Sequence, residues 1–123
     1  MILATPQPLT IVVPREIRSV NDWMYKHWRA YTGERDAWML FLRVQLRPRT
    51  HPPTRPVRAT ILSLRNRIID YGNFVGGAKP IPDCLKRLGY IVDDSPRWWT
   101  CEYVQQRAPK ALRCTRISLL EVA

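Results

Sequence analysis

Long hydrophobic runs are missing from this sequence of 123 residues. No apolar stretch approaches the roughly 20 consecutive residues that a membrane-spanning helix requires, so we expect no membrane partner. The apolar start, residues 1–13, is interrupted by Pro6 and Pro8 and has no basic residues ahead of it. This pattern argues against a secretory signal peptide, in which a charged start precedes an unbroken apolar segment.

Cysteines are few and widely spaced: Cys84, Cys101 and Cys114 are the three in the chain. An odd number without C-x-x-C spacing predicts neither a disulfide framework nor a zinc site. We therefore expect these cysteines to be small buried hydrophobic side chains in a protein of the reducing cytoplasm.

Acidic residues are outnumbered. The sequence has 10 Asp and Glu against 20 Lys and Arg, a formal net charge of +10. Sixteen of the basic residues are Arg, whose planar guanidinium pairs bidentately with phosphate. This balance in a small domain points to a polyanionic partner, most often nucleic acid. A non-enzymatic RNA or ribosome binder and a structural phage protein also fit the charge or the size.

The two signs of charge are separated along the chain. Residues 37–69 contain seven arginines and no acid, and four of the ten acids then follow between positions 70 and 94. A nuclease needs a basic surface that holds the phosphate backbone and carboxylates that hold a metal ion against it. Helix caps and turns are the alternative use of such aspartates. The four acids are Asp70, Asp83, Asp93 and Asp94.

Hydrophobic residues make up 46% of the chain and charged residues 24%, which is ordinary globular composition. We expect one domain over residues 1–123, with no internal repeat. Alternating apolar and polar residues predict strands at 9–13, at 57–61 continuing through Leu64 towards Asp70, at 98–105 and at 112–120. The proline-rich segment 48–56 predicts an irregular surface loop, either a DNA contact or a passive linker.

Two helices are predicted from apolar residues spaced i, i+3, i+4, i+7. The first spans residues 34–46 and the second 80–88, with Gly89 as its C-cap. A glycine-rich turn is expected at 72–77 and another turn at 93–96. The predicted fold is α/β (α+β), a small mixed sheet with two main helices packed on one face. The expected buried faces are Ala37, Leu40, Phe41 and Val44 in the first helix, and Ile81, Cys84, Leu85 and Leu88 in the second.

Aromatic and basic residues alternate over residues 21–31. Such a segment either stacks on bases and binds phosphates or covers the edge of the core. Trp98 and Trp99 raise a similar choice, between the core and a subunit interface. The residues concerned in 21–31 are Trp23, Tyr25, Lys26, His27, Trp28, Arg29 and Tyr31.

The segment 65–97 resembles the RusA family of phage and bacterial Holliday-junction resolvases. The family pattern is Asp-x-Asp-Asn, a Lys at the start of the following helix, an Asp and a Leu within it, and Asp-Asp after it. The segment Ser19-Val20-Asn21 is loosely similar to an Asn-containing stretch near the family's N-terminus. The matching motifs are Asp70-x-x-Asn73, Gly76-Gly77-x-Lys79-Pro80, Asp83-x-Leu85 and Gly89-x-x-x-Asp93-Asp94-Ser95-Pro96.

The resemblance implies a Mg²⁺-dependent homodimer, with Mn²⁺ as a substitute ion, that nicks four-way DNA junctions symmetrically in recombination and repair. It also implies a cytoplasmic protein of a bacterial host cell, encoded by a phage or prophage. Asp70 and Asp94 match the catalytic, metal-binding aspartates, Asp93 their acidic neighbour and Lys79 the functional lysine. Asn73 and Asp83 match supporting or structural positions. For DNA contact we expect Arg65, Arg67, Lys79, Lys86 and Arg97.

Gly72 departs from the family pattern, which has its second Asp at this position. Mg²⁺ usually keeps several waters and one or two carboxylates, so Asp70 and Asp94 would still form a minimal site. A missing carboxylate would weaken metal binding and shift the ion relative to the phosphate, to which phosphoryl transfer is sensitive. A catalytically impaired junction-binding protein is therefore the alternative to an active nuclease.

Overall fold

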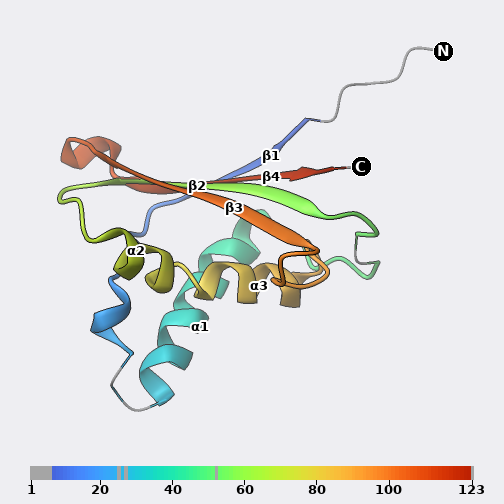
Figure 1. Cartoon of the computed structure of the whole chain (residues 1–123), viewed down its shortest axis with the longest axis horizontal. Coiled ribbons are helices and arrows are strands. Elements are labelled where there is room, and N and C mark those ends of the chain that lie inside the picture. The colour runs from blue at the N-terminus through green and yellow to red at the C-terminus, as the bar shows by residue number, and fades with distance from the viewer. Residues whose placement is uncertain (1–6, 25, 27, 52, 123) are drawn as a thin grey trace.

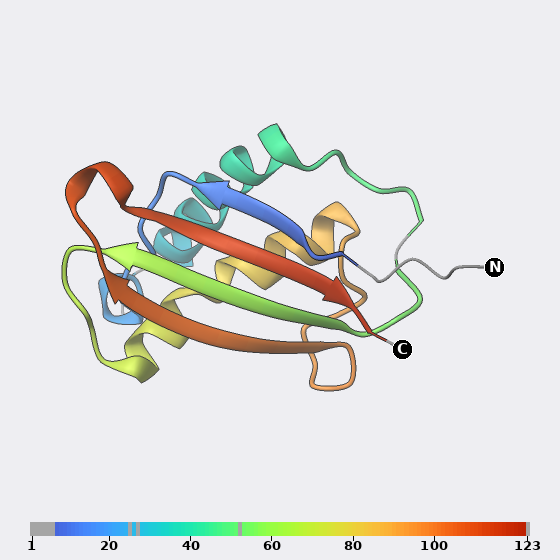
Figure 2. The ribbon, with the colours of Figure 1, turned by 90° about the horizontal axis from the view of Figure 1, so that it is seen from above.

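A four-stranded sheet forms one layer of the protein, in a computed structural model that describes residues 7–24, 26, 28–51 and 53–122. The strand order is β1-β4-β2-β3 (Figure 2). β4 runs antiparallel to β1 and β2, whereas β2 and β3 are parallel, so the sheet is mixed as the sequence predicts. The strands are β1 (Leu9–Val13), β2 (Val57–Arg65), β3 (Trp99–Arg107) and β4 (Cys114–Glu121).

The three α-helices form the second layer and lie on one face of the sheet (Figure 1). Within the described residues no α-helix covers the opposite face, and the predicted α+β architecture is confirmed. Within the described ranges no helix has the length and apolarity needed to cross a membrane. The helices are α1 (Trp28–Gln45), α2 (Tyr71–Gly77) and α3 (Pro80–Leu88), with short 3₁₀ turns η1 (Val20–Asp22) and η2 (Lys110–Leu112).

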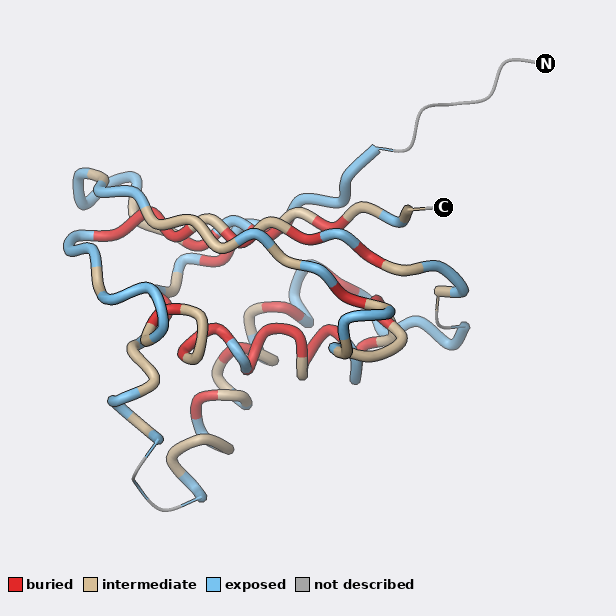
Figure 3. Tube along the Cα trace, viewed as in Figure 1, coloured by how far each residue is buried: buried red, intermediate tan, exposed pale blue. Residues whose placement is uncertain are grey.

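The core lies between the sheet and the helices, where the buried residues of both layers face each other (Figure 3). Alternate residues of β1, β2 and β4 point into it, because successive side chains of a strand face opposite ways. Cys84 is buried, as predicted, while Cys101 and Cys114 are half-buried, and all three are free. The largest fully buried side chains include Trp38, Phe74, Ile61, Ile81, Leu85 and Ile117.

α1 differs from its prediction in both start and orientation. It begins at Trp28 rather than at Glu34, and its buried residues are Glu34, Trp38 and Leu42. The prediction that Leu40 and Val44 are buried is wrong, because they are 70% and 85% exposed. Residues four apart share a helix face, so both sets satisfy helical spacing, and the large Trp38 ring fills the core instead.

α2 replaces the glycine-rich turn predicted for residues 72–77, and β2 ends at Arg65 instead of running on to Asp70. The Asp70 side chain accepts a hydrogen bond of 3.2 Å from the Asn73 backbone N–H and so caps the helix. Glycine is needed for close packing rather than for a turn: a Cβ on Gly77 would lie 1.8 Å from the carbonyl oxygen of Arg18. α2 therefore rests directly on the chain just before η1.

α3 has the predicted bounds and the predicted buried face. Pro80 and Pro82 are accommodated because the first turn of a helix has no internal N–H partners to lose. Gly89 has a φ of 84° and caps the C-terminus in the left-handed conformation, which favours glycine. The turn predicted at 93–96 follows, and it returns the chain to the start of β3.

Candidate functional site

Lys79, Asp83 and Asp94 lie together beside the N-terminus of α3, and we name these three residues the α3 cluster. The Lys79 ammonium lies 3.7 Å from an Asp83 carboxylate oxygen and 4.0 Å from one of Asp94. Lys79 immediately precedes the helix, and Asp94 comes from the turn that follows it. The side chain of Lys79 is 57% exposed, so the cluster is open to a ligand.

Asp83 is the most enclosed carboxylate of the cluster. Burial raises its pKa above the usual value, and the nearby Asp94 charge raises it further. The Tyr31 hydroxyl of α1 donates a hydrogen bond to the same carboxylate. Asp83 is therefore held in position by α1, and a cation in the cluster would relieve its repulsion with Asp94.

Asp93 is engaged differently from its neighbour Asp94. Lys86 donates a 2.9 Å hydrogen bond to the Asp93 carboxylate. This bond lowers the pKa of Asp93, with hydrogen bonds from the Asp94 backbone and the Ser95 side chain acting in the same direction. Asp93 is thus paired with Lys86 in the turn after α3, while Asp94 points its carboxylate towards Lys79.

Asp70 lies at the far end of α2 from Lys79. Its carboxylate caps α2, whose seven residues span about 10 Å along the helix axis. A Cβ on Gly72 would lie 3.3 Å from the Asp70 carboxylate oxygen. An aspartate at 72, as in the family pattern, would therefore stand directly beside Asp70, and this chain lacks that pair.

The predicted metal ligands lie in two places: Asp70 caps α2, and Asp93 and Asp94 lie in the turn after α3. Within the described residues, no group of three or more His, Cys, Asp or Glu side chains is close enough to hold a metal ion. Asp83 and Asp94 nevertheless lie within reach of one ammonium group. Two carboxylates with waters and a substrate phosphate are a donor set that Mg²⁺ accepts. Asp83 and Asp94 are the two carboxylates of the cluster that could take part in such a donor set.

Other nucleophiles are disfavoured by their surroundings. Burial raises the pKa of the Cys84 thiol and of the Cys101 thiol to about 11. A thiol with such a pKa is almost entirely protonated at neutral pH and is a poor nucleophile. The chemistry of the α3 cluster is therefore that of carboxylates and a lysine.

The five predicted DNA contacts differ in exposure. Arg65 is 2% exposed and its guanidinium pairs with Glu16, which corrects its assignment as a DNA contact. Lys86 is exposed but paired with Asp93, and the guanidinium of Arg97 stacks on the Trp98 ring at 4.9 Å. Arg67 and Lys79 are exposed. Four of the five side chains are therefore exposed, and three of these four already have a partner within the chain.

The aromatic residues near the N-terminus differ in packing and exposure. The rings of Trp23 and Tyr31 pack at 5.1 Å and join η1 to α1, which supports the core-edge interpretation. Trp28 is 64% exposed, as stacking on a base would require. Tyr25 and His27 lie outside the described residues. Trp99 is 7% exposed and belongs to the core, whereas Trp98 is half-buried.

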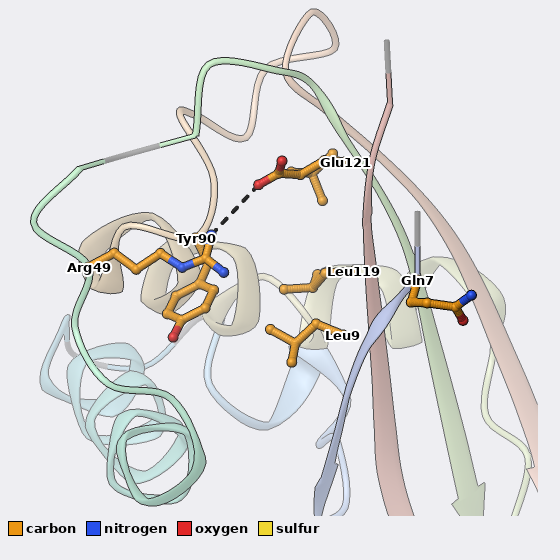
Figure 4. Close-up of a pocket in the computed structure, with 7 residues that line it drawn as sticks. Gln7, Leu9, Arg49, Tyr90, Leu119 and Glu121 are labelled. Carbon is orange, nitrogen blue, oxygen red and sulfur yellow. Dashed lines mark ion pairs between the residues drawn. The ribbon is translucent and has the colours of Figure 1, made fainter. Parts of the chain in front are cut away.

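A separate hollow of about 220 Å³ lies against β1 and β4, on the side where Tyr90 packs (Figure 4). Arg49 crosses it, with its guanidinium 4.1 Å from the centre of the Tyr90 ring and 3.7 Å from the Glu121 carboxylate. Leu9 and Leu119 form its apolar wall. Its charges are paired and it holds neither a nucleophile nor a second carboxylate, so it is not the candidate site.

A scan against models of known protein families finds no match to this chain, and a search of curated proteins finds no similar sequence. Sequence reasoning missed the part played by Tyr31, because no local pattern links residues 52 positions apart. The sequence also gave no reason to single out Arg18 and Arg113 among the sixteen arginines, and the structure places both beside one hollow.

Proposed function

We propose that this protein is a Mg²⁺-dependent, structure-selective endodeoxyribonuclease that resolves four-way DNA junctions by paired nicks, in the manner of the RusA family. The observation that carries the proposal is the convergence of Lys79, Asp83 and Asp94 on an exposed edge of a chain with a net charge of +10. Paired nicking requires two such sites, so the proposal includes a homodimer. It also places the protein in the cytoplasm of a bacterial host, encoded by a phage or prophage.

The residues of the α3 cluster have distinct parts in this proposal. When bound, Mg²⁺ or Mn²⁺ supplies an activated water and neutralises charge on the scissile phosphate. Asp83 and Asp94 hold the ion, and the Tyr31 hydrogen bond keeps the Asp83 carboxylate in one orientation. Lys79 donates hydrogen bonds to a phosphate oxygen, on which negative charge develops during the reaction.

A second candidate function is junction binding without cleavage. It is favoured by Gly72, which leaves Asp70 without the neighbouring carboxylate of the family pattern. In this case the basic surface would retain its affinity for branched DNA, and the incomplete set of carboxylates would not support hydrolysis.

The decisive experiment is cleavage of a labelled synthetic four-way junction with Mg²⁺ or Mn²⁺. Wild type would be compared with Asp94→Asn, Gly72→Asp and, as a matched control for carboxylate loss, Asp36→Asn on the exposed side of α1. Symmetric nicks that disappear in Asp94→Asn and persist in Asp36→Asn would support the nuclease. Cutting by Gly72→Asp alone would support the binding protein. No cutting by any variant, with equal affinity for junction and duplex, would refute both and leave a general nucleic-acid binder.

Thermal denaturation tests the metal site without relying on activity. A ligand that binds the folded state raises the melting temperature, so Mg²⁺ should stabilise the wild type. The shift should be lost in the double variant Asp83→Asn with Asp94→Asn and kept in Asp70→Asn. A shift that survives the double variant but disappears in Asp70→Asn would place the ion at α2 instead.

A further inference from the structure

Four arginines from three separate segments line a hollow of about 500 Å³ at the end of β2 and the start of β4. We call it the arginine hollow. Arg18 precedes η1, Arg65 and Arg67 stand at the end of β2, and Arg113 lies just before β4. These segments meet at the edge of the protein that also carries the N-terminus of α2 (Figure 1).

Buried Arg65 organises the hollow. Its guanidinium donates to the Ile17 carbonyl at 3.0 Å and to the Arg67 carbonyl at 2.8 Å. It also pairs with the Glu16 carboxylate at 3.0 Å and lies 3.3 Å from the Ser63 hydroxyl. A guanidinium can serve several acceptors at once because its donors are held in a fixed plane. Arg65 therefore fixes the backbone at both positions from which Arg18 and Arg67 extend.

The exposed charges around the hollow are mainly positive. Glu16 forms an ion pair with Arg65. The other charged residues of the lining are three arginines and one acid: Arg18, Arg67, Arg113 and Asp22. Arg113 is held rigidly, because it donates to the Ala108 carbonyl and to the Asn66 side chain, both at 3.1 Å. Arg18 is 61% exposed, and its Glu34 contact is long at 3.9 Å.

We propose that the arginine hollow binds the phosphodiester backbone of a duplex DNA arm. The planar guanidinium of arginine matches the geometry of two phosphate oxygens. Because the backbone that carries these arginines is already held in place, little conformational entropy is lost on binding. Ile69 lines the hollow, and Asp70 follows it at the N-terminus of α2. A DNA arm held there lies about one α2 length, roughly 10 Å, from the start of α3. The site rests on the proposed function only for the identity of the polyanion as DNA.

The test measures the salt dependence of binding to a linear duplex and to a four-way junction, without divalent metal. Each phosphate contact contributes about −0.9 to the slope of log K against log salt concentration. Arg18→Gln and Arg67→Gln should each reduce the magnitude of this slope by about one. Arg58→Gln and Arg116→Gln are matched controls, because both residues are exposed on the helix-free side of the sheet and should leave the slope unchanged.

Equal slope changes in all four variants would overturn the proposal in favour of diffuse attraction, and unchanged slopes for Arg18→Gln and Arg67→Gln would overturn it outright. The result is separable from the nuclease proposal. Slope losses confined to the hollow, in a protein that cuts no junction, would support the hollow and refute the nuclease. Cleavage that depends on Asp94, with salt slopes unchanged in all four arginine variants, would support the nuclease and refute the hollow.

Discussion

The Tyr31 hydroxyl donates a hydrogen bond to the Asp83 carboxylate and so connects α1 to α3 across 52 residues of sequence. The carboxylate it holds is also 3.7 Å from Lys79, and Asp94 raises its pKa. One phenol of α1 therefore determines the position of a charged group beside the proposed catalytic lysine. Packing of the two helices is in this way linked to the geometry of the α3 cluster.

Tyr31→Phe removes this hydrogen bond while keeping the ring. Because the lost donor stabilises the charged carboxylate, the pKa of Asp83 should rise further, and the free energy of unfolding should fall by about 1–2 kcal/mol. Carboxyl NMR titration and urea unfolding measure the two effects. Tyr71→Phe, on a residue 62% exposed, is the control. A pKa of Asp83 that does not move would contradict the positioning role.

Asp83 and Asp93 should affect stability with opposite pH dependence. The pKa of Asp83 is raised above its model-compound value of 3.8, so its folded state favours the proton. Its contribution to stability is full below pH 3.8 and is lost as the pH rises through the folded pKa. The pKa of Asp93 is lowered, so its contribution is present above pH 3.8 and is lost as the pH falls through the folded pKa.

The measurement is urea unfolding of Asp83→Asn and Asp93→Asn between about pH 3 and pH 7, around the reference pKa of aspartate. Relative to wild type, Asp83→Asn should gain stability as the pH rises. Asp93→Asn should lose stability over the same rise. The same trend in both variants would show that the two carboxylates do not have the environments described.

The orientation of α1 predicts unequal effects for two of its apolar residues. Leu42 is fully buried, so Leu42→Ala should cost about 2–5 kcal/mol through lost burial and a residual cavity. Val44 is 85% exposed, so Val44→Ala should be neutral or slightly stabilising, because alanine favours the helix. Chemical denaturation measures both. A large loss of stability for Val44→Ala, with none for Leu42→Ala, would show that the face with Val44 is the buried one.

Gly77→Ala tests the contact between α2 and the chain before η1. The added Cβ would lie 1.8 Å from the Arg18 carbonyl oxygen, so the backbone must move, at a cost of about 3 kcal/mol or more. Gly72→Ala is the matched control: its Cβ would lie 3.3 Å from one Asp70 side-chain oxygen, a contact that a small side-chain rotation relieves. Thermal melts of the two variants should therefore differ widely. Similar melting temperatures would mean that α2 does not rest on this segment.

The sequence determined the strands, α3 and the class of fold. Period-two alternation and the loop signals placed β1 with its exact residues and the other strands to within a few positions. The face and capping glycine of α3 were correct because its apolar residues occupy a single stripe. The net charge of +10 can likewise be read from the sequence, because it does not depend on the fold, and it predicts a polyanionic partner.

Tertiary structure decided the features for which the local sequence is compatible with two outcomes. α1 carries apolar residues at helical spacing on more than one face, and only docking on the sheet selected the face with Trp38 and Leu42. The glycines of α2 have the composition of a turn, yet residues 71–77 form a helix, and at Gly77 close packing on the Arg18 carbonyl leaves no room for a Cβ. Arg65 has the same chemistry as the surface arginines, but its burial makes it a structural residue rather than a DNA contact. Local sequence cannot carry such information, because each outcome depends on residues distant along the chain.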